Sequence, residues 1–152
     1  MPREIEFRGK SKDKRYGWVY GYLEIIQGCD SQTAVIHSFN DWNLNGRFEV
    51  DIKTVGQFTG IYDKNKKKIY ENDCLGFSEM RENLEGKLRK TVKIRRVVYG
   101  CGESDAIVGY YLLRYGDDSG YYTEFLTASK GRKATVVGNM TDGVSKEKSY
   151  KV

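Results

Sequence analysis

Hydrophobic and polar residues alternate along several short segments of the chain, which is the pattern of β-strands that bury one face. In the first half the alternating segments cover residues 4–8, 18–26, 33–39 and 48–52. Within the second of these, alternation places Trp18, Tyr20 and Tyr22 on one side of the strand, and Val19, Leu23 and Ile25 contribute to the other. This half therefore predicts a small β module that begins with a hairpin.

The second half of the chain repeats the pattern more regularly. Its apolar or alternating segments cover residues 74–77, 91–99, 106–115, 121–128 and 135–140. Five short strands with turn-forming residues between them favour a small barrel or roll of the SH3-like kind. We expect a mainly β protein with at most one or two short helices. The expected organisation is an N-terminal β module over residues 1–62, an SH3-like β-barrel domain over residues 63–144 and a polar tail over residues 145–152.

One interval between the expected strands fits two structures. Residues 79–90 place Met80, Leu84 and Leu88 at positions i, i+4 and i+8, which is the spacing of one helical face. Gly86 disfavours the interior of a helix. The interval therefore predicts either a short helix or a long hairpin loop.

Composition agrees with a β-rich globular protein. Hydrophobic residues make up 39% of the chain and charged residues 31%, and 12 tyrosines accompany a single proline. No apolar run approaches the ~20 residues that cross a bilayer, and the N-terminus lacks the apolar core of a signal peptide. We expect a cytoplasmic protein without a membrane partner. The three cysteines are far apart in the sequence and are expected to be reduced thiols.

The net charge of +5 comes from one part of the chain. Residues 63–100 hold 11 Lys and Arg against 6 Asp and Glu. In this part, alternation in a strand would turn Val92 and Ile94 inward and Lys93 and Arg95 outward. Such a row of cations can follow a phosphate backbone, although Lys-rich strand edges also keep β proteins soluble. The candidate nucleic-acid-binding residues are Lys64, Lys66, Lys67, Lys68, Arg89, Lys90, Lys93 and Arg95.

No set of residues has the spacing of a known catalytic, metal or cofactor site. His37, the one histidine, lies in an apolar strand-like segment without a nucleophile motif beside it. The acidic pairs fall in expected turns and do not match a calcium-binding loop. These pairs are Glu103 with Asp105 and Asp117 with Asp118. We expect a protein that is not an enzyme and has no metal and no cofactor, and the sequence identifies no small-molecule substrate.

The abundance of aromatic side chains favours self-association. Aromatic residues make up 13% of this small chain, and those that the core leaves exposed are of the types enriched in interfaces. Unpaired strand edges also invite a symmetric partner. The alternative is that these aromatic rows face the core. The candidate residues for a homo-oligomer contact are Trp18, Tyr20, Tyr22, Tyr111 and Tyr115.

Six short phrases along the chain have the order and wording of one protein family. They read REIEFRGK at residues 3–10, WVYG at 18–21, TVGQFTG at 54–60, DKN at 63–65, IYEND at 69–73 and VVGN at 136–139. In these phrases the chain resembles the YopX-like family of small phage and prophage proteins. After residue 139 it continues MTDGV where relatives commonly read Y-x-N-P-E-L, so the usual C-terminal segment is absent or replaced. The resemblance implies a mostly β protein that ends in an SH3-like barrel, often associates with itself and carries no assigned catalytic residue.

The same resemblance singles out the segment 63–66, Asp-Lys-Asn-Lys, where relatives usually show Lys-Asn-Gly-Lys. Asn-Gly is the strongest signal of a two-residue hairpin turn, because both of its residues need a positive φ. Here Lys66 stands where the glycine would be, and a left-handed lysine costs about 1 kcal/mol. Either the loop is longer and looser or the strain is offset elsewhere, and we expect the looser loop.

These observations predict a phage- or prophage-derived accessory protein of the bacterial host cytoplasm that works as a non-enzymatic binding or scaffold module. The alternative is a nucleic-acid-binding protein that uses the basic segment 63–100. A third hypothesis, an enzyme built around His37, would need carboxylates from distant loops.

Overall fold

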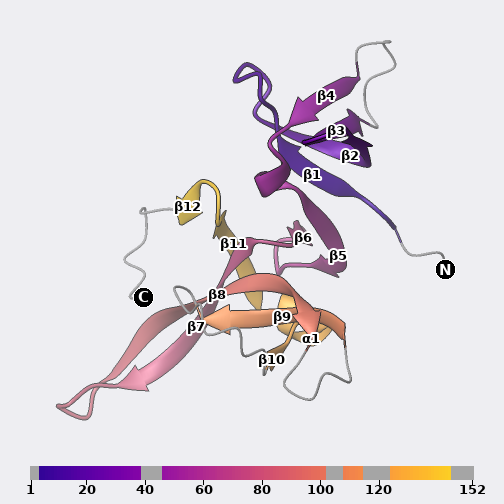
Figure 1. Ribbon diagram of the computed structural model, residues 1–152. Coiled ribbons are helices and arrows are strands. Elements are labelled where there is room, and N and C mark those ends of the chain that lie inside the picture. The colour runs from indigo at the N-terminus through magenta and orange to yellow at the C-terminus, as the bar shows by residue number, and fades with distance from the viewer. Residues whose placement is uncertain (1–3, 39–45, 102–107, 115–123, 145–152) are drawn as a thin grey trace. The chain divides into compact units, whose positions relative to one another are not determined.

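The computed structural model describes residues 4–38, 46–101, 108–114 and 124–144 (Figure 1). The first elements are β1 (Phe7–Lys10), β2 (Trp18–Gln27), β3 (Gln32–Ser38), β4 (Arg47–Val50), the 3-10 helix η1 (Ile52–Thr54), β5 (Gly56–Tyr62) and β6 (Lys68–Tyr70). They are followed by β7 (Asp73–Glu82), β8 (Leu88–Cys101), β9 (Val108–Arg114), β10 (Glu124–Phe125), α1 (Ala128–Gly131), β11 (Ala134–Asn139) and β12 (Gly143–Val144). The prediction of a mainly β protein with one or two short helices is confirmed for these residues.

The chain divides into two compact units, residues 1–60 and residues 61–152. One sheet has the strand order β4-β3-β2-β1-β5-β6, and the other has the order β10-β9-β8-β7-β11-β12. Strand β5 runs through the boundary and so belongs to both units. The predicted N-terminal hairpin is the antiparallel pair of β1 and β2, in which Gly9 lies opposite Val19.

Alternation along three strands builds the core of the first unit. Ile36 of β3 is fully buried, and it lies opposite Leu23 of β2 on one side and Phe48 of β4 on the other. Side chains of paired residues share one face of a sheet, so these strands bury the same face. The buried members of this cluster are Val19, Ala34, Ile36 and Val50.

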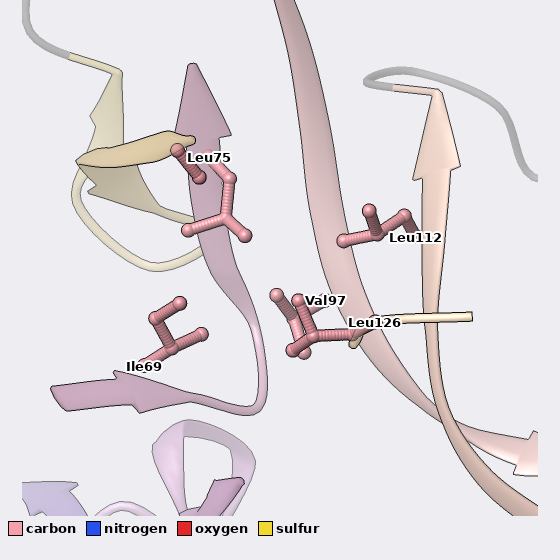
Figure 2. Packing of buried hydrophobic residues seen from close by; sticks show 6 residues of the cluster. Ile69, Leu75, Val97, Leu112 and Leu126 are labelled. Atoms are coloured by element: carbon pink, nitrogen blue, oxygen red, sulfur yellow. The ribbon is translucent and has the colours of Figure 1, made fainter. Parts of the chain in front are cut away.

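The sheet of the second unit buries residues on both of its faces. The larger cluster consists of Ile69, Leu75, Val97, Leu112, Leu126 and Ala134 (Figure 2). A second cluster consists of Val98, Tyr111 and Leu113, with Phe125 packed against it. The neighbours Val97 and Val98 thus serve different clusters, as the two-residue period of a strand requires. Among the described residues the sheet ends at β10 and β12 and does not close into a barrel, which is consistent with the predicted roll.

Residues 79–90 form a hairpin. β7 and β8 pair continuously as far as Glu82 opposite Leu88. Between them Gly86 has a φ of 75°, and Asn83 Oδ1 accepts hydrogen bonds from the backbone N–H groups of Glu85 and Lys87 at 3.0 and 2.9 Å. Glycine adopts this left-handed conformation at little cost. The helical alternative is therefore wrong, because a tight turn separates the apolar residues that a helix would have aligned.

The turn between β5 and β6 has the same pattern of hydrogen bonds as the β7–β8 turn, with Asp63 in the place of Asn83, although it lacks glycine. Asp63 N–H donates to Lys67 O at 2.8 Å, and Lys66 N–H donates to Asp63 O at 3.0 Å. Lys66 has a φ of 63°, so the lysine keeps the left-handed conformation and the expected looser loop is wrong. The buried carboxylate of Asp63 offsets the strain, since it accepts N–H groups from Asn65, Lys67 and Val136 at 2.8, 2.9 and 3.0 Å.

Candidate interaction surfaces

The side of β2 that faces away from the first core carries three aromatic residues, which we call the aromatic face: Trp18, Tyr20 and Tyr22. Tyr20 is 42% exposed and Tyr22 is 62% exposed, whereas Val19 between Trp18 and Tyr20 is buried. The guanidinium carbon of Arg8 lies 4.8 Å from the centre of the Trp18 ring. This cation–π contact holds the indole against β1. The predicted division of β2 into an aromatic side and an aliphatic side is confirmed.

His37 lies on the same side of the first sheet. It is opposite Tyr22 of β2 and Arg47 of β4. Its Nε2 atom is 2.6 Å from Oε2 of Glu24, and Nη2 of Arg47 is 3.9 Å from the same oxygen. All three side chains are about half exposed. The histidine is therefore part of a charged cross-strand group at the surface, although its sequence neighbours are apolar.

The structure distributes the eight basic candidates over three places. Lys64, Lys66 and Lys67 are exposed in the β5–β6 turn, and Lys68 is half-buried where β6 begins. Arg89 and Lys90 are exposed near the β7–β8 turn, and Lys93 and Arg95 are half-buried farther along β8.

The predicted alternation in β8 holds, but the face that carries Lys93 and Arg95 is not a solvent face. Lys93 lies opposite Phe77 and Arg95 lies opposite Leu75, so both share a face with the larger apolar cluster. Lys93 Nζ is 5.9 Å from the centre of the Phe77 ring. Arg95 is 22% exposed, with its Nε 4.0 Å from a carboxylate oxygen of Glu124. These long side chains cover the border of the core with their stems, and the outward orientation expected from the sequence is wrong.

The second aromatic row does not add to the aromatic face. Tyr111 is 1% exposed, and its ring stacks on Phe125 with the ring centres 4.3 Å apart. It therefore packs inside the second unit. Tyr115 lies outside the described residues, as do the acidic pairs at 103 with 105 and 117 with 118.

In the described part of the chain, no group of three or more His, Cys, Asp or Glu residues could hold a metal ion. No helix there is long and apolar enough to cross a membrane.

The sequence did not reveal that the outer half of the β7–β8 hairpin is a two-stranded ribbon. The pairing of β11 with β7 ends at Phe77, and the pairing of β9 with β8 begins at Arg95. Among the described residues, 78–94 therefore lie beyond both neighbouring strands, and we call them the arm. In Figure 1 the arm projects from the rest of its sheet. Met80 is 60% exposed and Leu88 67% exposed, and Leu84 is fully exposed at the tip.

Comparison with known proteins places the chain in a family without supplying a characterised relative. No curated protein matches it. The family model described as YopX protein matches residues 6–141, which span both units and nearly all of the described residues. The chain therefore belongs to the YopX family.

Proposed function

We propose that this protein is a non-enzymatic accessory protein of phage or prophage origin that works in the bacterial cytoplasm as a self-associating scaffold. The observation that carries the proposal is the aromatic face, where Tyr20 and Tyr22 are 42% and 62% exposed on a sheet surface opposite the core. Aromatic residues are enriched in interface centres, because they bury a large area while losing few side-chain rotations. The partner that we propose for this face is a second copy of the chain.

The surroundings of the aromatic face support binding more than catalysis. The charged group beside it carries both signs, with the Glu24 carboxylate between His37 and Arg47. A mixed polar rim around exposed rings is the usual composition of a protein–protein interface. A histidine that acts as a general base needs a nucleophile or substrate proton within hydrogen-bond reach, whereas the side-chain partner of His37 here is the Glu24 carboxylate.

The test is the mass of the protein in solution as a function of concentration. Light scattering should show a mass above that of the monomer for the wild type, and Tyr20→Ser with Tyr22→Ser should abolish the association that this face supports. The matched control is Tyr16→Ser with Tyr62→Ser, because these tyrosines are 52% and 43% exposed elsewhere. A wild type that stays monomeric up to ~100 μM, well above typical micromolar affinities, would refute the proposal.

One observation supports nucleic-acid binding as the alternative function. Lys64 N–H donates to Ala134 O at 2.9 Å, Ala134 lies opposite Phe77, and Phe77 lies opposite Lys93. The exposed lysines of the β5–β6 turn therefore begin beside β11, and the two strands β11 and β7 lie between them and Lys93. If this surface binds single-stranded DNA, affinity should fall steeply with salt and Lys66→Gln with Lys67→Gln should weaken it. Titrations at low salt that show no association would exclude this function.

A further inference from the structure

In the part of the chain that the structure describes, no strand lies beside either edge of the arm, and the two edges differ in charge. Beyond Phe77 the outer edge of β7 reads Ser78-Glu79-Met80-Arg81-Glu82, and before Arg95 the outer edge of β8 reads Leu88-Arg89-Lys90-Thr91-Val92-Lys93-Ile94. A strand edge without a neighbour presents unpaired N–H and C=O groups that can pair with another strand. Whether either edge can pair with a second copy of itself therefore depends on the side chains along it.

The β8 edge does not fit itself. Its charged residues are Arg89, Lys90 and Lys93, so every charge that a second copy brings is positive. Like charges directly opposite each other in a sheet destabilise the pairing. Cations on an exposed edge are also the usual means by which β proteins block edge-to-edge contact. This edge is protected against its own copy.

The β7 edge fits itself in one antiparallel register. A two-fold axis at Met80 places Met80 opposite Met80 of the second copy and Glu79 opposite Arg81 of the second copy, twice by symmetry. Moving the axis to Glu79 or to Arg81 would instead set like charges face to face. Within one chain Glu79 and Arg81 already lie on one face, with Arg81 Nε 2.6 Å from Glu79 Oε1. The pairing would join two such ion pairs into a network of alternating sign.

The same register covers the exposed apolar residue of this edge. Met80 is 60% exposed and lies on the other face of the arm from Glu79 and Arg81. Paired residues of an antiparallel ladder have Cβ atoms about 4.5–5.5 Å apart, so the two methionines would contact each other. Charge and apolar burial thus favour the same axis.

We infer that the β7 edge of the arm, residues 78–82, is a docking site for the β7 edge of a second copy, paired antiparallel about Met80. The inference extends the proposed self-association by adding a surface in the other unit, and it does not require the aromatic face. A contact of five residues per chain buries less than the ~1,200 Å² of a standard interface. The pairing is therefore weak in isolation.

Charge reversal tests the register, and it is measured in the Tyr20→Ser, Tyr22→Ser background so that only the arm contributes. By sedimentation equilibrium, Glu79→Arg alone and Arg81→Glu alone should each dimerise at least tenfold more weakly than that background protein. A 1:1 mixture of the two variants should regain dimerisation, because arginine at 79 and 81 then faces glutamate at 81 and 79. The double swap Glu79→Arg with Arg81→Glu should also dimerise. A folding defect in either variant could not produce recovery on mixing.

A cysteine at the axis gives a second measure. In a Cys29→Ser background, which removes the exposed thiol among the cysteines whose burial the structure describes, Met80→Cys should form a disulfide-linked dimer faster than Ser78→Cys, since residue 78 would lie opposite residue 82 of the partner. A mixture that stays monomeric, or equal cross-linking at 78 and 80, would overturn the inference. A β7 edge that accepts a strand of another protein would leave this chain monomeric throughout, and that result would overturn it as well.

Discussion

Replacing Asp63 by alanine tests how the chain tolerates a left-handed lysine in the β5–β6 turn. The Asp63 side chain is 4% exposed, and its Oδ1 accepts the N–H groups of Asn65 and Lys67 while its Oδ2 accepts that of Val136. The two turn N–H groups belong to exposed residues, so water can replace their partner. The Val136 N–H belongs to a half-buried residue of β11 and has less access to water.

The expected cost follows from these surroundings. A hydrogen bond to a charged group contributes about 1.5–3 kcal/mol, and one that water replaces contributes about 0.5 kcal/mol. Asp63→Ala should therefore lower the free energy of unfolding by about 3 kcal/mol, of which about 2 kcal/mol comes from Val136. Asp63→Asn can keep an oxygen at the Oδ1 position and lose only the acceptor for Val136. It should cost about 2 kcal/mol.

The chain supplies its own control in the β7–β8 turn. Asn83 accepts the N–H groups of Glu85 and Lys87 in the same geometry, but the bonds of its side chain are local and exposed. Asn83→Ala should cost about 1 kcal/mol. Urea unfolding followed by circular dichroism measures all three variants against the wild type. Equal losses for Asp63→Ala and Asn83→Ala would refute the claim that Asp63 links the turn to β11.

Two further predictions concern turns. Lys66→Gly should raise the free energy of unfolding by about 1 kcal/mol, because it removes a lysine from a left-handed conformation. Gly86→Lys should lower the free energy of unfolding by a similar amount, because it puts a lysine into such a conformation. Urea unfolding measures both changes, and a destabilising Lys66→Gly would contradict the strain at Lys66. The hydrogen bonds from Arg15 lower the pKa of the Asp13 carboxyl below its usual value of 3.8, so any stability from this pair is present above that value and is lost as pH falls through the lowered pKa. A carbon-detected NMR titration should show a low Asp13 midpoint that Arg15→Gln raises, and equal midpoints in the two proteins would contradict it.

The sequence was sufficient for the strands because alternation is a local property. Trp18, Tyr20 and Tyr22 lie on one side of β2 as predicted, since a strand of any sheet must send alternate residues to opposite faces. Which face is buried depends on what packs against it. Alternation in β8 separates Ile94 from Lys93 and Arg95, yet both faces of the second sheet carry apolar clusters. The two-residue period of β8 alone therefore could not show whether Lys93 and Arg95 lie on a solvent-exposed face.

The turns show where local signals compete with each other. The apolar residues at 80, 84 and 88 satisfy a helical period, but Asn83 and Gly86 supply the cap and the left-handed glycine of a hairpin turn. In the β5–β6 turn the missing glycine pointed to a looser loop. The compensation comes from Val136, 73 residues away in the chain, whose N–H reaches Asp63. A contact so distant in the sequence leaves no local signal.

The last prediction concerns the excess positive charge on the β8 edge of the arm. Arg89 and Lys93 both lie on the β8 edge, and an antiparallel pairing about Thr91 would set each against the other in a second copy. Arg89→Glu turns both repulsive contacts into attractive ones. Each arm would then have two self-complementary edges, β7 and β8, and alternating contacts through them would not close on a dimer.

In the Tyr20→Ser, Tyr22→Ser background, which leaves only the arm to associate, Arg89→Glu should therefore form large assemblies, seen as light scattering that grows with concentration. In the same background Arg89→Gln, which removes the charge without reversing it, should assemble far less. Adding Glu79→Arg to Arg89→Glu should return that protein to small species, because growth then needs both edges. If Arg89→Glu keeps the mass of the background protein at every concentration, cations on β8 do not protect this edge, and the charge of the basic segment needs another explanation.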